Sequence, residues 1–213
     1  QTALMGMSKP MVFDGIDDHV AFGDVLDMGT SDYSFSLWFK NDVQETAYLI
    51  DKRGGAGAGY QIVVDSSGGI ISVHINDGSD TFGMDGGSDI SDNKWHHVVV
   101  VFDKSSNTDS YIYVDGADDT ASRSGTIGDV GDTSNSENLF IGRRNDSSNE
   151  FDGIINEVSA FSSVLTLAQV QELFNDGVPF DLENNTLTGS PTLTGYWRND
   201  GASSWSDRSA NSN

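Results

Sequence analysis

The sequence predicts an all-β fold, namely a two-sheet antiparallel jelly-roll sandwich with one short helix near residues 166–176. Three observations favour this fold class. Residues 94–102 are largely apolar on both alternating faces and rich in β-branched side chains, which is typical of a strand covered on both sides. At least ten short strand patterns are separated by turns rich in Gly, Asn and Asp. Helical spacing occurs convincingly only once, so a doubly wound fold of alternating strands and helices is excluded.

The first half of the chain reads as a series of short strands. Residues 1–10 show no clear period and are interpreted as a lead-in. Residues 11–22 predict a strand, a tight acidic turn and a second strand, and residues 33–40 alternate apolar and polar side chains like a half-buried strand. Four more strands are expected, with short Gly-rich turns between the first three of them, over residues 46–52, 59–65, 70–75 and 81–84.

The second half continues the β pattern and then ends it with a helix. Residues 110–116 form a predicted hairpin with the 94–102 strand, followed by a long surface loop over residues 125–137 and by strands over 138–143 and 151–161. Thr166 and Gln169 match a capping box, an apolar stripe follows, and Gly177 ends the helix. We expect the sandwich to occupy residues 11–180 and residues 181–213 to be a C-terminal extension or connector.

The charge balance limits the classes of partner. The chain has 33 acidic and 11 basic residues, a formal net charge of -22, and no cysteine. Nucleic acid is excluded as a partner because contacts to phosphates require Lys and Arg. No apolar run approaches the roughly 20 residues of a membrane span, so membrane insertion is not expected.

A set of short motifs stands in a particular order along the chain. They are Phe13-Asp14-Gly15, the segment 35–40, Trp95-His96-His97-Val98, Tyr113-Val114-Asp115-Gly116, Ile141-Gly142, the segment 151–158 and the Leu165-Thr166 helix start. Together they cover residues 11–177 and resemble the laminin-G-like, concanavalin A-like jelly-roll family, including its pentraxin-related members in phage and bacterial surface proteins. Asn156 departs from the Asp that the family usually has there. The resemblance implies an extracellular binding role on a fold that serves many functions.

The resemblance also implies a calcium site. In the pentraxin-like branch, the loop after the strand containing Ile141-Gly142 and a loop after an early strand bind the ion together. Carried over to this sequence, the ligands are Asp51, Asn145, Asp146 and Glu150, which offer the oxygen atoms that Ca²⁺ prefers. A second acidic cluster lies in the first turn, where such side chains also cap the turn backbone, and consists of Asp14, Asp17 and Asp18.

Catalysis is not expected. Glycosidases of this fold place paired carboxylates along one strand. Glu150 and Asp152 begin such a pattern, but the third carboxylate is missing and Glu157 falls on the opposite strand face from Glu150. His96 and His97 are adjacent in a strand and point to opposite faces, so they cannot bind one metal ion together.

Glycan binding is the third candidate chemistry. Sugars stack on aromatic rings and form hydrogen bonds with amides, carboxylates and guanidinium groups. Tyr60 follows a Gly-rich turn, Arg53, Arg143 and Arg144 lie in loops expected at one end of the sandwich, and Trp38 lies on the polar face of its strand. Ordinary surface packing is the competing interpretation for each of these residues.

The leading hypothesis is a non-catalytic, lectin-like adhesion domain that recognises a glycan or cell-surface polysaccharide with the help of Ca²⁺. The alternative is a structural module, such as a virion decoration, fibre or capsid-associated protein, that acts by assembling with other subunits. Either function places the protein outside the cell, on a cell surface or on a virion surface.

Overall fold

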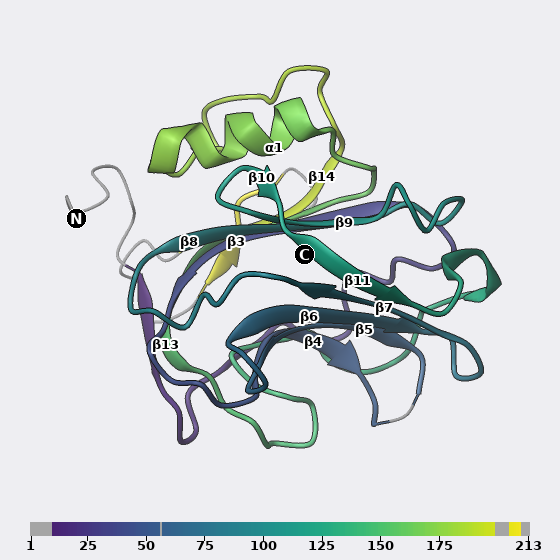
Figure 1. Ribbon diagram of the computed structural model, residues 1–213, viewed down its shortest axis with the longest axis horizontal. Helices are drawn as coiled ribbons and strands as arrows, with labels where there is room; N and C mark the ends of the chain where they lie inside the picture. The colour runs from purple at the N-terminus through teal and green to yellow at the C-terminus, as the bar shows by residue number, and fades with distance from the viewer. Residues whose placement is uncertain (1–9, 56, 199–204, 210–213) are drawn as a thin grey trace.

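The structure, a computed structural model, describes residues 10–55, 57–198 and 205–209. Within them the chain forms two antiparallel β-sheets that pack face to face (Figure 1), with one α-helix outside the larger sheet. This arrangement confirms the predicted fold class. Among the described residues, no helix is both long and apolar enough to cross a membrane. The predicted lead-in falls, apart from Pro10, outside the described residues.

The larger sheet has the strand order β10-β9-β8-β3-β13-β14-β15, and β1 pairs with β13 beside this path. All of its pairs are antiparallel. Its strands are β1 (Met11–Asp14), β3 (Tyr33–Lys40), β8 (His96–Phe102), β9 (Tyr111–Val114), β10 (Ala117–Asp118), β13 (Asp152–Phe161), β14 (Leu193–Arg198) and β15 (Ser206–Asp207).

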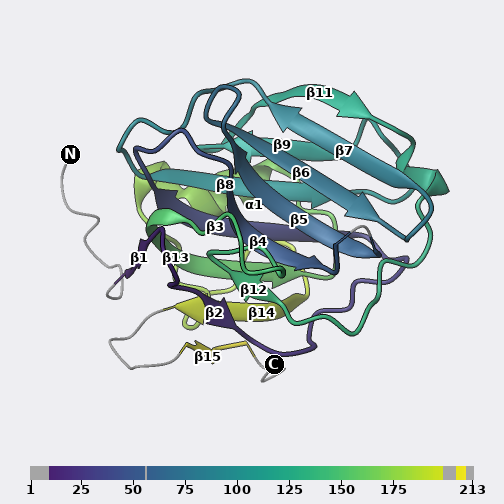
Figure 2. The same ribbon diagram turned by 90° about the horizontal axis from the view of Figure 1, so that it is seen from below.

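The smaller sheet has the order β11-β7-β6-β5-β4-β12-β2, and Figure 2 looks onto its outer face. Short 3₁₀ turns follow β11 (Ile127–Asp129) and the α-helix (Asn175–Gly177). The strands of this sheet are β2 (Val20–Ala21), β4 (Ala47–Arg53), β5 (Gly59–Asp65), β6 (Ile70–Asn76), β7 (Thr81–Gly86), β11 (Thr120–Ser124) and β12 (Phe140–Ile141).

Strand β8 is covered on both faces, as its composition predicts. Val98, Val100 and Phe102 are fully buried in the core between the two sheets. Val99 and Val101 belong to a second apolar cluster beneath the helix. The predicted hairpin with β9 is confirmed by their antiparallel pairing. Apolar faces on both sides explain why this strand occupies an interior position between β9 and β3.

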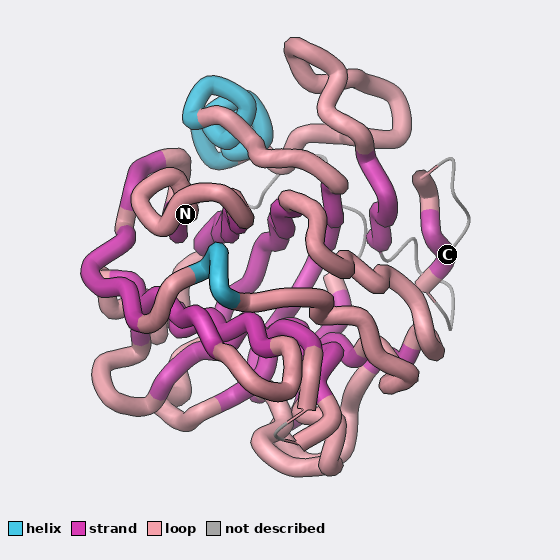
Figure 3. The backbone as a smooth tube through the Cα atoms, turned by 90° about the vertical axis from the view of Figure 1, so that its right-hand side faces the viewer, coloured by secondary structure: helices cyan, strands magenta, loops and turns pink. Residues whose placement is uncertain are grey.

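Helix α1 (Leu167–Phe174) covers the outer face of the larger sheet, and Figure 3 shows it standing outside the strand layers. The capping box is present, because the Thr166 side chain accepts from the Gln169 amide and the Gln169 side chain accepts from the Thr166 amide. Val170 and Leu173 are buried in the apolar cluster beneath the helix. The predicted helix is therefore confirmed, together with its start.

The first two strands and the turn between them lie where the sequence predicts them, but the two strands do not pair with each other. β1 pairs with β13 in the larger sheet, whereas β2 pairs with β12 in the smaller sheet. The acidic turn between them therefore carries the chain from one sheet to the other. Both pairings join residues more than 100 positions apart, which local alternation of side chains does not reveal.

The C-terminal region also differs from expectation. Residues 193–198 form β14, which pairs with β13, and Trp197 is fully buried with its ring centroid 4.8 Å from that of Phe22. The sandwich therefore extends past the predicted boundary at residue 180, because Tyr196 and Trp197 need the interior of the fold. Likewise, the 125–137 segment is more than a surface loop, since Ile127 and Val130 are buried in the core.

Candidate binding groove and acidic pocket

A groove with a volume of about 470 Å³ lies on the outer face of the smaller sheet. Strands β4, β5 and β6 supply most of its floor through two cross-strand rows, Gln61–His74 and Tyr48–Val63–Ser72. We call it the outer groove, and its volume lies within the range of about 300–1,000 Å³ usual for ligand sites. Its lining residues are Thr46, Tyr48, Arg53, Gly55, Gln61, Val63, Asp65, Ser72, His74 and Arg144.

Arg53, a predicted ligand-binding residue, is fixed at one side of the outer groove. Its Nε donates to the carbonyl oxygen of Gly57 at 3.2 Å, and its Nη1 donates to Oε1 of Gln61 at 3.3 Å. Gln61 is itself buried in the sheet. Across the described ranges, Arg53 forms no ion pair with a carboxylate, so part of its guanidinium group is available to a ligand.

Arg144 reaches the same groove from the loop that follows β12. Its Nη1 lies 3.1 Å from Oδ2 of Asp146, and its guanidinium carbon lies 5.8 Å from the ring centre of Tyr48. The structure therefore brings Arg53 and Arg144 to one groove. Arg143 does not line it, because its guanidinium group lies over the Phe140 ring at 4.5 Å.

Asp51 anchors the Arg144 loop from below. The side chain is fully buried, and its Oδ2 accepts a hydrogen bond of 2.7 Å from the main-chain amide of Asn145. The other oxygen, Oδ1, has no hydrogen-bond partner among the described residues. Burial raises the pKa of Asp51 to about 6, although the hydrogen bond from Asn145 opposes this shift.

The expected calcium ligands are divided between two places. The main-chain amide of Asn145 contacts Asp51, but the side-chain nitrogen of Asn145, Nδ2, donates to Oε2 of Glu137 at 2.7 Å. Asp146 is paired with Arg144, and Glu150 lines a different pocket. The four side chains therefore do not converge on one point, because each loop contact directs them to a different neighbour.

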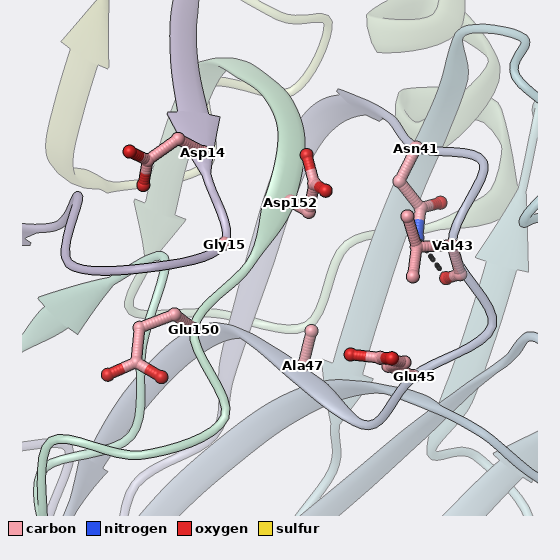
Figure 4. A pocket seen from close by; sticks show the side chains of 8 residues that line it. All are labelled: Asp14, Gly15, Asn41, Val43, Glu45, Ala47, Glu150 and Asp152. Carbon is pink, nitrogen blue, oxygen red and sulfur yellow. Dashed lines mark hydrogen bonds between the residues drawn. The ribbon is translucent and has the colours of Figure 1, made fainter.

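Glu150 lies instead in a small acidic pocket at one end of the sandwich (Figure 4), with a volume of about 70 Å³. Four carboxylates from three segments of the chain line it, and no basic side chain among the described residues does. A cavity of this size is too small for a sugar, whereas its oxygen-rich lining matches the ligand preference of Ca²⁺. The acidic pocket is lined by Asp14, Gly15, Asn41, Val43, Glu45, Ala47, Glu150 and Asp152.

The cluster in the first turn is occupied with backbone contacts. Carboxylate oxygens of Asp14, Asp17 and Asp18 lie within 4.8 Å of one another. Asp14 Oδ1 accepts from the amides of Ile16 and Asp17, and Asp18 Oδ2 accepts from the amide of Asp14. The Ile16 amide and the other backbone donors lower the pKa of Asp14. These contacts are those of a capped turn.

Two aromatic residues expected to contact ligand are buried instead. Tyr60 is 1% exposed in the core, and its hydroxyl donates to the carbonyl oxygen of Leu26 at 3.0 Å. Trp38 is 3% exposed and stacks on His97 at 5.0 Å and on Phe174 at 5.9 Å. Both expectations are corrected, because α1 covers the polar face of β3 and the Tyr60 side chain points between the sheets.

The two adjacent histidines lie in unlike surroundings. His97 is buried beside Ser36, with 2.8 Å between Nε2 and Oγ, and burial lowers its pKa to about 3. His96 instead lies between two carboxylates, with Nδ1 2.9 Å from Asp115 and Nε2 3.1 Å from Asp92. Asp115 also accepts a hydrogen bond of 2.8 Å from the His97 main-chain amide, but the two imidazole rings have different side-chain partners, which agrees with their positions on opposite strand faces.

Sequence reasoning missed Tyr48, Gln61 and His74 as groove residues. Gln61 and His74 occupy positions of their strands that project away from the core, so alternation alone predicts their outward direction. In β4 the register shifts between Tyr48 and Ile50, which places Tyr48 and Asp51 on the same face despite their odd spacing. That irregularity hides the aromatic wall of the groove from a simple period-two pattern.

Comparisons with known proteins agree with this architecture. A family model described as the concanavalin A-like lectin/glucanases superfamily matches residues 14–171. A search of curated proteins finds no significant match.

Solved structures share the fold. A candidate carbohydrate-binding protein from Bacteroides ovatus is 20% identical with a TM-score of 0.65, over 92% of this chain and 52% of that chain, so the chain spans about half its length. The heptameric SAP-like pentraxin of Limulus polyphemus is 16% identical (TM-score 0.59; 76% and 80% covered). Domain 4 of an extracellular GH43 arabinanase from Geobacillus stearothermophilus, in complex with arabinotriose, is 22% identical (TM-score 0.58; 80% and 79% covered).

Proposed function

The chain belongs to the concanavalin A-like lectin/glucanases superfamily, and from this premise we propose that it is a non-catalytic glycan-binding domain that acts outside the cell. Two similar structures support a glycan as the ligand, namely the candidate carbohydrate-binding protein and the arabinanase domain in complex with arabinotriose. The extracellular location is supported by the arabinanase, which is described as extracellular.

The outer groove is the observation that carries the proposal. Its volume of about 470 Å³ accommodates one or a few sugar rings, and it is open along the sheet. The half-buried Tyr48 ring offers a flat apolar surface for a sugar face, while Gln61, His74 and Arg53 offer polar groups for hydroxyls. This combination of one aromatic wall and several fixed polar groups is what a sugar requires.

The distribution of carboxylates supports binding without hydrolysis. Glycosidases need two carboxyl groups that flank the scissile bond. Asp65 is the one carboxylate among the lining residues of the outer groove. Glu150 and Asp152 share the acidic pocket, whose volume of about 70 Å³ leaves no room for a sugar between them.

A glycan-array screen followed by calorimetry tests the proposal. Replacing Tyr48 with Ala removes the aromatic wall and is expected to weaken glycan binding by about tenfold or more. Tyr111→Ala is the matched control, because Tyr111 is a partly exposed tyrosine on β9, outside the groove. Absence of binding to any glycan, together with stable oligomers in solution, would overturn the proposal in favour of a structural assembly module.

We also propose that calcium binds in the acidic pocket. Glu150, one of the ligands implied by the family resemblance, lies there with Asp14, Glu45 and Asp152. These side chains come from β1, the segment before β4 and the start of β13, so a bound ion would neutralise their repulsion and join three segments. The effect of calcium on the unfolding temperature tests the site.

A further inference from the structure

We propose that the outer groove selects glycans that carry an isolated acidic sugar, whose carboxylate or sulfate group is bound by Arg53 and Arg144. This inference rests on the proposed glycan-binding function and specifies the chemical class of the ligand. It is carried by two observations, namely the distribution of charge around the groove and the unused donors of Arg53.

The outer groove reverses the charge balance of the rest of the protein. The chain has 33 acidic and 11 basic residues, yet the groove lining contains two arginines and a single carboxylate, that of Asp65. The acidic pocket, by contrast, is lined by four carboxylates. An anionic ligand therefore finds in the outer groove a favourable place on an otherwise repulsive surface.

Arg53 is prepared to bind an anion. A guanidinium group has five N–H donors in a rigid planar fork, and the contacts to Gly57 and Gln61 use two of them. These contacts hold the group in place without neutralising its charge, since both acceptors are uncharged amide or carbonyl oxygens. The remaining donors suit the paired oxygens of a carboxylate or a sulfate, which guanidinium groups bind with two parallel hydrogen bonds.

Arg144 adds a second positive charge, and its present partner, Asp146, can be replaced by a ligand. Its partner Asp146 has a side chain 49% exposed, and exposed ion pairs of this kind contribute little, so a ligand anion can replace the Asp146 carboxylate. Asp51 lies behind both arginines but is fully buried, and Asp65 lies at the end of β5. Burial lowers the pKa of His74, so that side chain is a neutral hydrogen-bonding group near neutral pH.

The total charge restricts the ligand to a sparsely charged glycan. A polyanionic chain that entered the groove would place its further charges over a protein of net charge -22. At physiological ionic strength this repulsion acts over a Debye length of about 8 Å, so it affects the charges on sugars that lie within one or two units of the protein surface. A single acidic sugar within a neutral chain gains the two guanidinium contacts and avoids this repulsion.

The experiment compares matched oligosaccharides by calorimetry. The pairs are sialyllactose and lactose, and sulfated lactose and lactose, and polygalacturonate serves as the polyanion. We expect at least one acidic oligosaccharide to bind about tenfold more tightly than its neutral counterpart, since bidentate charged contacts are the strong ones. The pair that responds identifies carboxylate or sulfate. Polygalacturonate should bind more weakly per site than the acidic oligosaccharide at low salt, and tighter binding of it would overturn the restriction to isolated charges.

Variants separate this inference from the proposed function. Arg53→Gln, and independently Arg144→Gln, should abolish the preference for the acidic member while binding of the neutral member persists. Arg123→Gln is the matched control, because Arg123 bonds the Ser110 carbonyl oxygen and does not line the groove. Equal binding of acidic and neutral members by the unmodified protein would overturn this inference alone, whereas binding of no glycan at all would overturn the proposed function with it.

Discussion

The main-chain amide of Asn145 donates a hydrogen bond of 2.7 Å to Oδ2 of the fully buried Asp51. This contact joins the loop that carries Arg144 to the middle of β4 and so fixes one side of the outer groove. Burial destabilises the charged form of the Asp51 carboxylate and raises its pKa from 3.8 to about 6.

Asp51→Asn is therefore expected to stabilise the protein at alkaline pH. A carboxyl group whose pKa is raised in the folded state stabilises that state below the unfolded pKa, and this contribution is lost as the pH rises through the folded pKa. The loss occurs between about pH 4 and pH 6, and a shift from 3.8 to about 6 corresponds to roughly 3 kcal/mol. Asparagine keeps an oxygen for the Asn145 amide without the charge.

Urea unfolding at two pH values measures this effect. Asp51→Asn should raise the free energy of unfolding at about pH 8 by about 1–3 kcal/mol and leave it nearly unchanged near pH 4. Asp51→Ala, the control, leaves the Asn145 amide without its acceptor and should destabilise at both pH values. A variant with asparagine that is less stable at alkaline pH would show that the charge itself stabilises the loop.

His96 provides a second pH dependence, in a higher window. Burial alone would lower the pKa of His96, but hydrogen bonds and charge from Asp115 and Asp92 outweigh it, so the pKa is raised above 6.5. Its stabilising contribution is fully present below about pH 6.5 and is lost as the pH rises through the folded pKa. His96→Gln should therefore destabilise the protein at mildly acidic pH and have a smaller effect at alkaline pH. Equal destabilisation at both pH values in thermal unfolding would contradict a charged His96.

Lys52 is a buried cation with partly exposed partners, which predicts an asymmetry between its variants. Its side chain is fully buried, and Nζ lies 2.7 Å from Asp24 and 3.4 Å from Asp27, whose side chains are 49% and 41% exposed. In Lys52→Met the two carboxylates return to water, so we expect a loss of only about 1–2 kcal/mol. The double variant Asp24→Asn with Asp27→Asn leaves the ammonium buried without a counter-charge.

That double variant should cost about 3 kcal/mol or more in urea unfolding near neutral pH. Adding Lys52→Met to it should restore part of the lost stability, because the unpaired buried charge is then removed. If the triple variant is the least stable of the three, the stabilising effect of Lys52 lies in its packing or in its hydrogen bond to the Glu137 carbonyl oxygen.

The fold follows from the sequence wherever a local period sets the structure. The apolar faces of residues 94–102 and the capping box at Thr166 predict β8 and the start of α1, because side-chain alternation and caps act over a few residues. The sheet to which each short N-terminal strand belongs, and the burial of Trp197 in the core, depend on pairings between distant segments. Local patterns do not contain that information.

The candidate site is predictable only in part, for the same reason. Arg53, expected in a loop, ends strand β4, whereas Arg144 lies in the loop after β12. Both side chains are partly exposed and line the outer groove, which their charge and position in the sequence suffice to suggest. Trp38 looks available from alternation, yet α1 lies over it, and Tyr48 is hidden by the register shift in β4. The alternation pattern of a single strand cannot predict exposure that depends on another element or on an irregular strand pairing.

Gly142 begins the loop that carries Arg144, and we expect this position to tolerate no side chain. Its φ is +88°, and a Cβ atom would lie 2.3 Å from Cε1 of Phe13. Gly142→Ala therefore combines backbone strain with a clash against a buried ring, and should lower the free energy of unfolding by about 3 kcal/mol. Gly23→Ala isolates the strain, since Gly23 has a φ of +76° with no atom within 4 Å, and should cost about 1 kcal/mol. Equal losses would show that Phe13 moves aside.

Calcium should stabilise the protein by binding in the acidic pocket. The Glu150→Gln variant should be slightly more stable than the unmodified protein without calcium and less stable than it with calcium. Without calcium, removing one of the four carboxylates that line the pocket reduces their mutual repulsion and should raise the unfolding temperature slightly. With calcium at a hundredfold excess over its dissociation constant, the unmodified protein gains about 2.7 kcal/mol, and the variant with one ligand fewer gains less. Asp109→Asn, in an exposed turn, should respond to calcium like the unmodified protein. Thermal unfolding with calcium and with chelator measures all three, and identical unfolding temperatures of the unmodified protein in the two conditions would refute the site.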